Sequence, residues 1–108
     1  ACEAMLRHFR KGGRVDGLYA VTDGLALGAY HAIKEKGLSI PGDVTVVGVG
    51  DHDGSAYFDP PLPVVGVPRT ELGREAGRLL MRQLEQPGVP PLKVEIPVEA
   101  MLRASTGG

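Results

Sequence analysis

The stretch from Val44 to Leu62, VTVVGVGDHDGSAYFDPPL, decides the fold of this chain. Residues 44–49 form an apolar, β-branched run that is too short for a helix, and it predicts a strand buried on both faces of a parallel sheet. Glycines and acidic residues follow at 50–54. Because ligands of open α/β sheets bind beyond the carboxyl ends of the strands, this loop is the first place to look for a site.

Composition limits what the chain can be. Its 108 residues suffice for one domain, and a net charge of −1 without a basic patch excludes direct binding of nucleic acid or an anionic membrane. No apolar run is long enough to span a bilayer, and no signal peptide is recognisable. A single cysteine, Cys2, cannot form an internal disulfide, which fits a cytoplasmic protein. Because Ala1 falls inside a predicted helix, we expect a piece of a longer protein.

A strand, helix, strand unit precedes the loop. Residues 18–21 predict a short buried strand, residues 24–36 predict a helix that Gly37 ends, and the strand at 44–49 follows. A unit of this length fits a right-handed parallel crossover, which places Thr22 and Asp23 at the same sheet edge as the loop at 50–53. Either Thr22 or Asp23 can cap the helix through its side-chain oxygen.

The remaining elements follow from spacing. We expect a helix over 1–11, an extended proline-rich path at 60–63, a strand over 64–67, a helix over 70–86 capped by Thr70, and a half-exposed strand over 94–100. The helix over 70–86 has a predicted buried stripe of Leu72, Ala76, Leu79, Leu80 and Leu84. The helix over 24–36 buries Leu25, Ala26, Ala29, Tyr30 and Ile33, and Leu27 and His31 widen its apolar face enough for a second packing partner.

The loop does not match three known kinds of binding site, namely a dinucleotide site, a calcium loop and a metal site. Gly48, Gly50 and Gly54 do not have the spacing of the dinucleotide fingerprint, and a calcium loop starting at Asp51 lacks its glycine and its bidentate glutamate. Asp51, His52 and Asp53 are adjacent and diverge, so they cannot enclose a metal. We therefore predict no catalytic residue, no cofactor and no metal. A cleft that binds a small polar molecule reversibly remains, beside the plainer alternative of a solvated loop.

The order of these elements resembles the ligand-sensing domain of the lactose and galactose repressor (LacI/GalR) family, which shares its fold with periplasmic sugar-binding proteins. The residues that carry the resemblance are TDGLALGAYHAIKEKGLSIPGDVTVVGV at 22–49, YFDPPL at 57–62, ELGREAGRLL at 71–80, and the strand that ends LRAST at 102–106. Together these motifs are specific, and they cover nearly the whole chain.

The resemblance implies an incomplete flavodoxin-like α/β sheet with flanking helices. Residues 1–108 would be part of a periplasmic-binding-protein-like domain, mainly its C-terminal lobe, with 63–90 crossing to the other lobe. The lobes would close on a sugar-like or nucleobase-like effector and so change the operator affinity of an N-terminal helix-turn-helix, which this chain lacks. We expect a homodimer in the cytoplasm without membrane contact.

The resemblance also implies site residues. Thr22, Asp23, Gly50 and Asp51 would bind the ligand. Three positions depart from the family pattern, because Thr22 replaces an asparagine, Gly50 replaces a sugar-binding aspartate, and Val67 replaces a polar crossover residue. The residues expected in a dimer interface are Leu25, Leu27, Tyr30 and Tyr57.

Two other functions compete with a repressor. A periplasmic solute receptor of a sugar transporter has the same fold, and a signal peptide upstream of Ala1 would favour it, whereas a helix-turn-helix there would favour the repressor. A nucleotide-dependent α/β enzyme is the alternative from another class, and turnover or tight cofactor binding would favour it.

Overall fold

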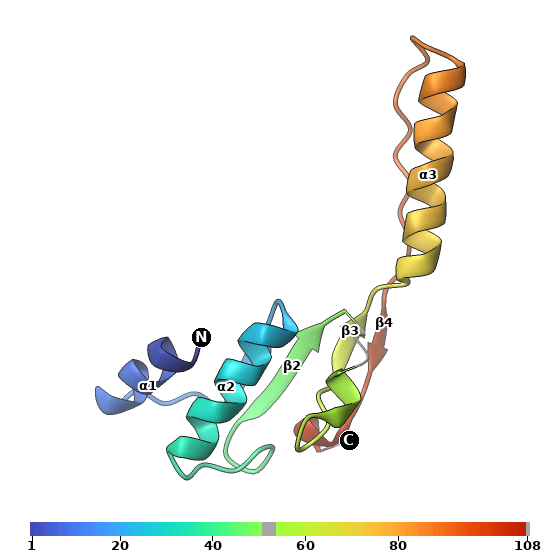
Figure 1. The fold of residues 1–108 in the computed structure, drawn as a ribbon. Helices are drawn as coiled ribbons and strands as arrows, with labels where there is room; N and C mark the ends of the chain where they lie inside the picture. The colour runs from blue at the N-terminus through green and yellow to red at the C-terminus, as the bar shows by residue number, and fades with distance from the viewer. Residues whose placement is uncertain (51–53, 108) are drawn as a thin grey trace. The chain divides into compact units, whose positions relative to one another are not determined.

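The computed structural model describes residues 1–50 and 54–107. It contains a four-stranded sheet with helices beside it (Figure 1). The strands, in sheet order, are β1 (Gly17–Ala20), β2 (Thr45–Val49), β3 (Val64–Gly66) and β4 (Glu99–Met101). The helices are α1 (Cys2–Arg10), α2 (Asp23–Glu35) and α3 (Arg69–Glu85), with short 3-10 helices η1 (Ser55–Tyr57) and η2 (Ala104–Thr106).

The first three strands are parallel. Ala20 of β1 lies beside Gly48 of β2, and Gly48 in turn lies beside Val64 of β3. α2 makes the crossover between β1 and β2, so both strands end at the same edge of the sheet, as predicted. β4 runs in the opposite direction to β3, and the sheet is therefore mixed (Figure 1).

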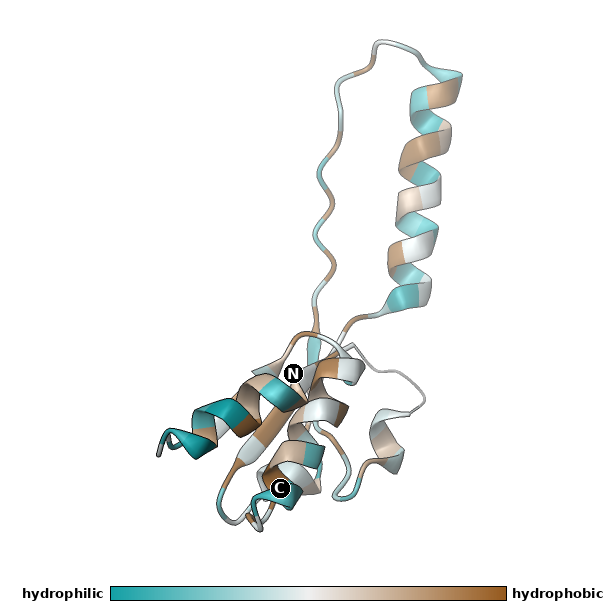
Figure 2. Cartoon of the chain, turned by 60° about the vertical axis from the view of Figure 1, so that its left-hand side comes forward, coloured by the Kyte–Doolittle hydropathy of each residue, from teal (hydrophilic) through white to brown (hydrophobic). Residues whose placement is uncertain are grey.

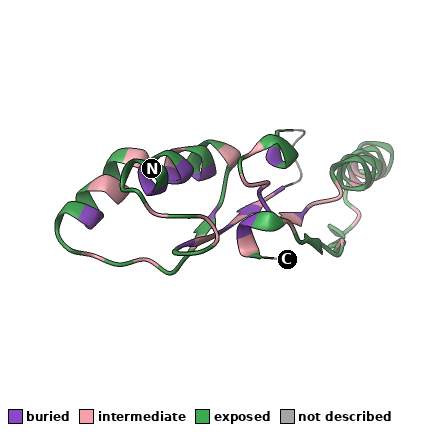
Figure 3. Cartoon of the chain, turned by 90° about the horizontal axis from the view of Figure 1, so that it is seen from below, coloured by how far each residue is buried: buried purple, intermediate pink, exposed green. Residues whose placement is uncertain are grey.

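The core lies between α2, α1 and one face of the sheet. α2 contacts β1 and β2, and α1 packs along α2. Figure 3 shows buried residues concentrated on α2 and the central strands. The largest fully buried apolar side chains are those of Ile33, Leu62, Val44, Val46 and Val64. Of the predicted apolar side of α2, Ala26, Ala29, Tyr30 and Ile33 are buried, whereas Leu25 is 40% exposed.

The sheet is less enclosed than the sequence predicts. In β2, Val46 and Gly48 are buried, but the alternate residues of the opposite face are only half-buried. Tyr19 of β1 is 61% exposed, so the prediction of a buried strand is wrong for most of β1. A parallel sheet needs a helical layer on each face for full burial, and the described residues supply this cover on one face.

Gly37 ends α2, and a tight turn then connects the helix to β2. Gly37 adopts a positive φ of 78°, the left-handed conformation expected at the end of the helix. In the following turn, the Asp43 carboxylate accepts hydrogen bonds from the Ser39 amide and hydroxyl, each at 2.7 Å. These bonds favour the ionised form, so the pKa of Asp43 lies below its usual value.

The C-terminal turn is tied to the centre of the sheet. The buried Ser105 hydroxyl donates to the Val46 carbonyl at 2.8 Å, and the Ser105 amide donates to the Pro61 carbonyl at 3.2 Å. Pairing of β3 with β2 begins only at Gly48, so β3 offers no donor to the Val46 carbonyl. The Ser105 hydroxyl supplies the hydrogen bond that a neighbouring strand would otherwise supply.

Residues 67–99 form a second unit, separate from 1–66 and 100–108. In Figure 2, α3 carries apolar residues interspersed with polar ones. None of its residues is buried, and Leu72, Leu80 and Leu84 are 49%, 60% and 64% exposed, so the prediction of a buried stripe is wrong for this chain. Among the described residues no sheet lies within this unit for the stripe to cover. That the unit belongs to a second lobe remains a prediction.

Two further predictions for this unit are wrong. Pro68 precedes α3 without a side-chain cap, and Thr70 lies inside the helix. The strand expected over 94–100 is present only as β4, because alternating side chains form a strand only where a neighbour offers backbone partners. Within the unit, the Arg82 guanidinium donates to the Pro90 carbonyl at 3.0 Å and so holds the returning chain along α3. No described helix is long and apolar enough to cross a membrane.

Replacing Ile33 by alanine should destabilise the chain. Because the side chain is fully buried between α2 and the sheet, the loss of its methyl groups should lower the free energy of unfolding by about 2–5 kcal/mol, as measured by urea denaturation. Leu102→Ala is the matched control, since Leu102 is 74% exposed. An Ile33→Ala chain as stable as the Leu102→Ala chain would contradict this placement of the core.

Candidate functional site

The ends of β1 and β2 form one polar corner of the sheet. Thr22 is the N-cap of α2, and its hydroxyl oxygen accepts a hydrogen bond from the Leu25 amide at 3.2 Å. The Ala26 amide donates to the Thr22 carbonyl at 3.0 Å. The structure therefore confirms that Thr22 caps the helix. Its exposed hydroxyl still has a proton to donate to a ligand.

Asp23 links the two strand ends. It is the first residue of α2, where the positive end of the helix dipole favours a carboxylate. Its Oδ2 accepts from the hydroxyl of the fully buried Ser55, at 3.4 Å, in the chain that follows β2. Its Oδ1 is buried and has no hydrogen-bond partner among the described residues. A buried acceptor without a donor is unfavourable, so this oxygen is ready to accept from a ligand hydroxyl or amine.

Gly50 directly follows β2, has a positive φ of 78° and is buried. Its amide donates to the Val65 carbonyl at 2.8 Å, so this N–H group belongs to the β2–β3 ladder and is not available to a ligand. A glycine is favoured here because the left-handed conformation strains most side chains. Asp51, the fourth predicted ligand residue, lies outside the described residues, and its role stays a prediction.

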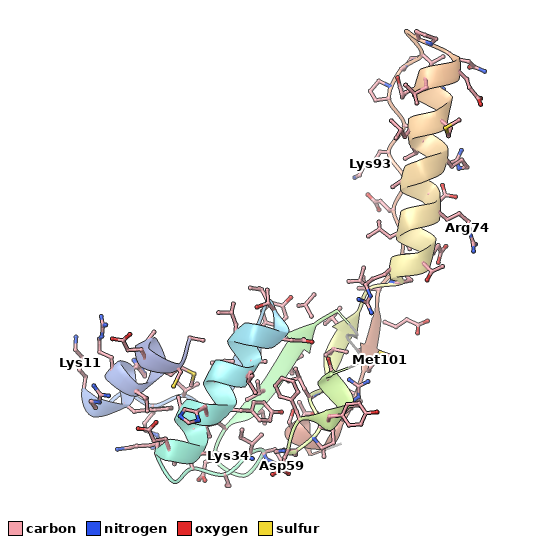
Figure 4. All side chains as sticks on the ribbon, in the orientation of Figure 1. Lys11, Lys34, Asp59, Arg74, Lys93 and Met101 are labelled. Atoms are coloured by element: carbon pink, nitrogen blue, oxygen red, sulfur yellow. The ribbon has the colours of Figure 1, made fainter. Side chains whose placement is uncertain are left out.

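Of the four predicted dimer residues, Leu27, Tyr30 and Tyr57 line a separate groove, whereas Leu25 is exposed outside it. A groove of about 820 Å³ is lined by the outer side of α2, the start of α1 and residues 54–59, and Leu27 and Tyr57 line it. Leu27 is 62% exposed and Tyr57 is 87% exposed. The exposed Lys34 and Asp59, which lie near each other in Figure 4, form an ion pair at 3.0 Å on this lining. The groove thus combines exposed apolar side chains with a charged border.

Tyr30 occupies the floor of the groove. It is only 4% exposed, its ring meets Phe58 edge-on with centroids 5.0 Å apart, and its hydroxyl donates to the Pro60 carbonyl at 3.0 Å. Burial raises the pKa of the Tyr30 hydroxyl. Tyr30 thereby fixes the segment after η1 against α2, and Leu27 and Tyr57 supply more of the exposed apolar area than Tyr30 does.

Sequence reasoning missed two functional partners. Ser55, which bonds to Asp23, and Asp59, which pairs with Lys34, are both far from their partners in the chain. The only sequence signal for Ser55 was its place at the end of the polar loop that follows the strand at 44–49.

Comparison with known proteins identifies the family. The periplasmic binding protein-like domain matches residues 2–106. A lactose operon repressor of Rhizobium radiobacter is 38% identical over 92 residues, which cover 85% of this chain and 80% of that protein. The chain belongs to the periplasmic binding protein-like family and, within it, to the LacI-type repressors. The predicted fold class and family resemblance are thus confirmed.

Solved structures agree with this assignment. A putative LacI-family regulator from Sanguibacter keddieii superposes with a TM-score of 0.91 at 33% identity, over 99% of this chain and 41% of that one. A lac repressor dimer bound to operator and the anti-inducer ONPF gives a TM-score of 0.87 at 27% identity, over 97% of this chain and 32% of that one. This chain therefore spans about two fifths of the first solved chain and about a third of the second.

Removing the α2 cap should weaken the polar corner. Thr22→Ala leaves the Leu25 amide without its acceptor, and should lower the free energy of unfolding by about 0.5–2 kcal/mol in urea denaturation. Thr22→Ser keeps the oxygen and is expected to retain most of that stability. Equal destabilisation by both substitutions would show that the hydroxyl oxygen is not the stabilising group.

Proposed function

We propose that this chain is the effector-sensing part of a LacI-type transcriptional repressor. The observation that carries the proposal is the polar corner at the ends of β1 and β2, where a buried carboxylate oxygen of Asp23 has no partner within the described ranges 1–50 and 54–107. Family membership supports this function, because the relatives are transcriptional repressors and not enzymes. The same relatives argue against a nucleotide-dependent enzyme and offer no support for a solute receptor.

The proposed mechanism is a shift between conformations. An effector at the polar corner would give the Asp23 Oδ1 a hydroxyl or amine donor and accept a bond from the Thr22 hydroxyl. If the effector binds one arrangement of the full sensing domain more tightly, it increases the population of that arrangement. A helix-turn-helix outside this chain would convert that shift into changed affinity for operator DNA in the cytoplasm.

The effector class follows from the groups available. Carboxylate and hydroxyl oxygens suit a small sugar-like or nucleobase-like molecule that is rich in donors. Gly50 provides no carboxylate where the family resemblance places a sugar-binding aspartate. Since an unpaired polar group in a buried site costs about 1–3 kcal/mol, a pyranose that needs this partner should bind more weakly than an effector that does not.

An Asp23→Asn substitution in the full-length protein should weaken effector binding. Titration calorimetry with lactose, ribose and adenosine as probes identifies which class binds the wild-type protein. For that probe, loss of the charged acceptor should raise the Kd about tenfold or more, because hydrogen bonds to charged groups contribute about 1.5–3 kcal/mol. We expect Asp51→Ala to weaken binding as well.

Asp16→Asn is the matched control for the calorimetry, because exposed Asp16 precedes β1 at the opposite edge of the sheet. If Asp23→Asn binds the probe as tightly as the Asp16→Asn protein, then the polar corner is not the effector site. Unchanged affinity after Asp51→Ala would remove that residue alone from the site.

The groove on α2 supports a homodimer. Single exposed apolar residues are ordinary on a surface, but Leu27 and Tyr57 line one groove over the buried Tyr30, and such continuity is typical of an interface. The lac repressor structure similar to this chain is a dimer. We therefore propose that α2 and the segment after β2 meet their copies in a symmetric pair.

Leu27→Glu should dissociate this dimer. A carboxylate in an apolar interface loses its hydration without gaining a partner, so sedimentation velocity should shift from dimer towards monomer. Leu102→Glu introduces the same charge at an exposed leucine outside the groove and should leave the dimer intact. A wild-type protein that is strictly monomeric, or a Leu27→Glu protein that remains dimeric, would contradict the proposed interface.

A further inference from the structure

Three metal-binding side chains meet where α1 crosses α2. Cys2 opens α1, and His31 and Glu35 lie one turn apart on α2. The ligand atoms of the three residues, the Cys2 Sγ, a His31 ring nitrogen and a Glu35 carboxylate oxygen, all lie within 4.8 Å of one another. The His31 Nε2 is already 3.4 Å from the Glu35 Oε2. The proposed effector function makes no use of this cluster.

The helix crossing holds the thiol over this turn of α2. A Cβ at Gly28 would come within 3.0 Å of the Cys2 amide nitrogen and 3.1 Å of the Ala1 Cβ. The absence of a side chain at Gly28 therefore allows the start of α1 to approach the α2 backbone. Residues 28, 31 and 35 share one face of α2 at helical spacing, so the position that admits α1 also brings Cys2 to the imidazole and the carboxylate.

We propose that Cys2, His31 and Glu35 bind a Zn²⁺ ion. Thiolate, imidazole and carboxylate are the three protein ligand types of zinc, at metal–ligand distances of about 2.0–2.3 Å. Tetrahedral geometry with these bond lengths places ligand atoms about 3.5 Å apart, close to the present His31–Glu35 distance of 3.4 Å. The Cys2 Sγ, which lies within 4.8 Å of both partners, completes the set of three ligands. Three protein ligands leave a fourth position for water.

The donor set selects the metal class. A thiolate ligand favours zinc and other softer transition metals over Mg²⁺ and Ca²⁺, which prefer oxygen. Cys2 is half-buried and lines the α2 groove together with His31, so an ion reaches the site in the separate monomer and the proposed homodimer would enclose it. Without a metal, the same residues would form only a surface histidine–glutamate pair beside a small packing residue.

Titration of the reduced full-length protein with Co²⁺ and then Zn²⁺ tests the site. Cobalt bound by Cys2 should produce a thiolate-to-metal charge-transfer band and the visible bands of a tetrahedral centre, and Zn²⁺ should abolish both by displacement. The part of the charge-transfer band that is lost in the Cys2→Ser protein reports this residue.

Single substitutions provide the second arm. Cys2→Ser should abolish the charge-transfer band. Loss of even an outer-shell partner costs about 10–100-fold in metal affinity, so His31→Gln and Glu35→Gln should each weaken Zn²⁺ binding at least about tenfold. His8→Gln is the matched control, because His8 lies on α1 outside the cluster and contacts the Arg14 carbonyl.

Two results would overturn the proposal: a wild-type chain without the charge-transfer band, or a His31→Gln chain that binds zinc as tightly as the His8→Gln chain. These outcomes are independent of effector binding, since the titration contains no sugar or nucleoside. Failure of the metal site would therefore leave the repressor function untouched.

Discussion

Parallel pairing of β1 with β2 is the constraint on which the rest of the structure depends. Because the two strands run in the same direction, α2 must carry the chain back along the sheet, and both strands end at one edge. The capped start of α2 and the segment after β2 are thereby brought together, and a hydrogen bond between Ser55 and Asp23 joins them. The parallel direction of the strands thus places polar groups that are far apart in sequence at one corner of the sheet.

α2 connects this corner with the rest of the chain. Its inner side supplies Ile33 and its alanines to the core, so its position is fixed by burial. Its outer side carries Leu27 in the groove and His31 in the cluster with Cys2. One helix therefore contributes residues to the polar corner, the proposed dimer surface and the proposed metal site. A small shift of α2 would move residues at all three. This arrangement suits a domain that reports ligand binding to a partner.

Local signals predicted the parts of the fold that local physics determines. The β-branched run at 44–49 correctly predicted β2, Gly37 correctly predicted the end of α2, and Thr22 was one of the two residues predicted to cap that helix. Burial of α3 could not be predicted, because an apolar stripe shows that a helix can be covered and does not show that the cover is within the chain. The strand over 94–100 failed for a similar reason, since alternation needs a neighbouring strand. The hydrogen bond between Asp23 and Ser55 and the proximity of Cys2 to His31 join distant segments, and no spacing rule finds them.

The most direct test of the account is where a bound effector perturbs the protein. Amide chemical shifts of the isotopically labelled full-length protein, recorded during titration with whichever of lactose, ribose or adenosine binds, locate that contact residue by residue. Within this chain we expect the largest shift changes at residues 22–24 and 50–55, which follow β1 and β2. Shifts concentrated instead at the opposite edge of the sheet, around Asp16 and Asp43, would contradict it.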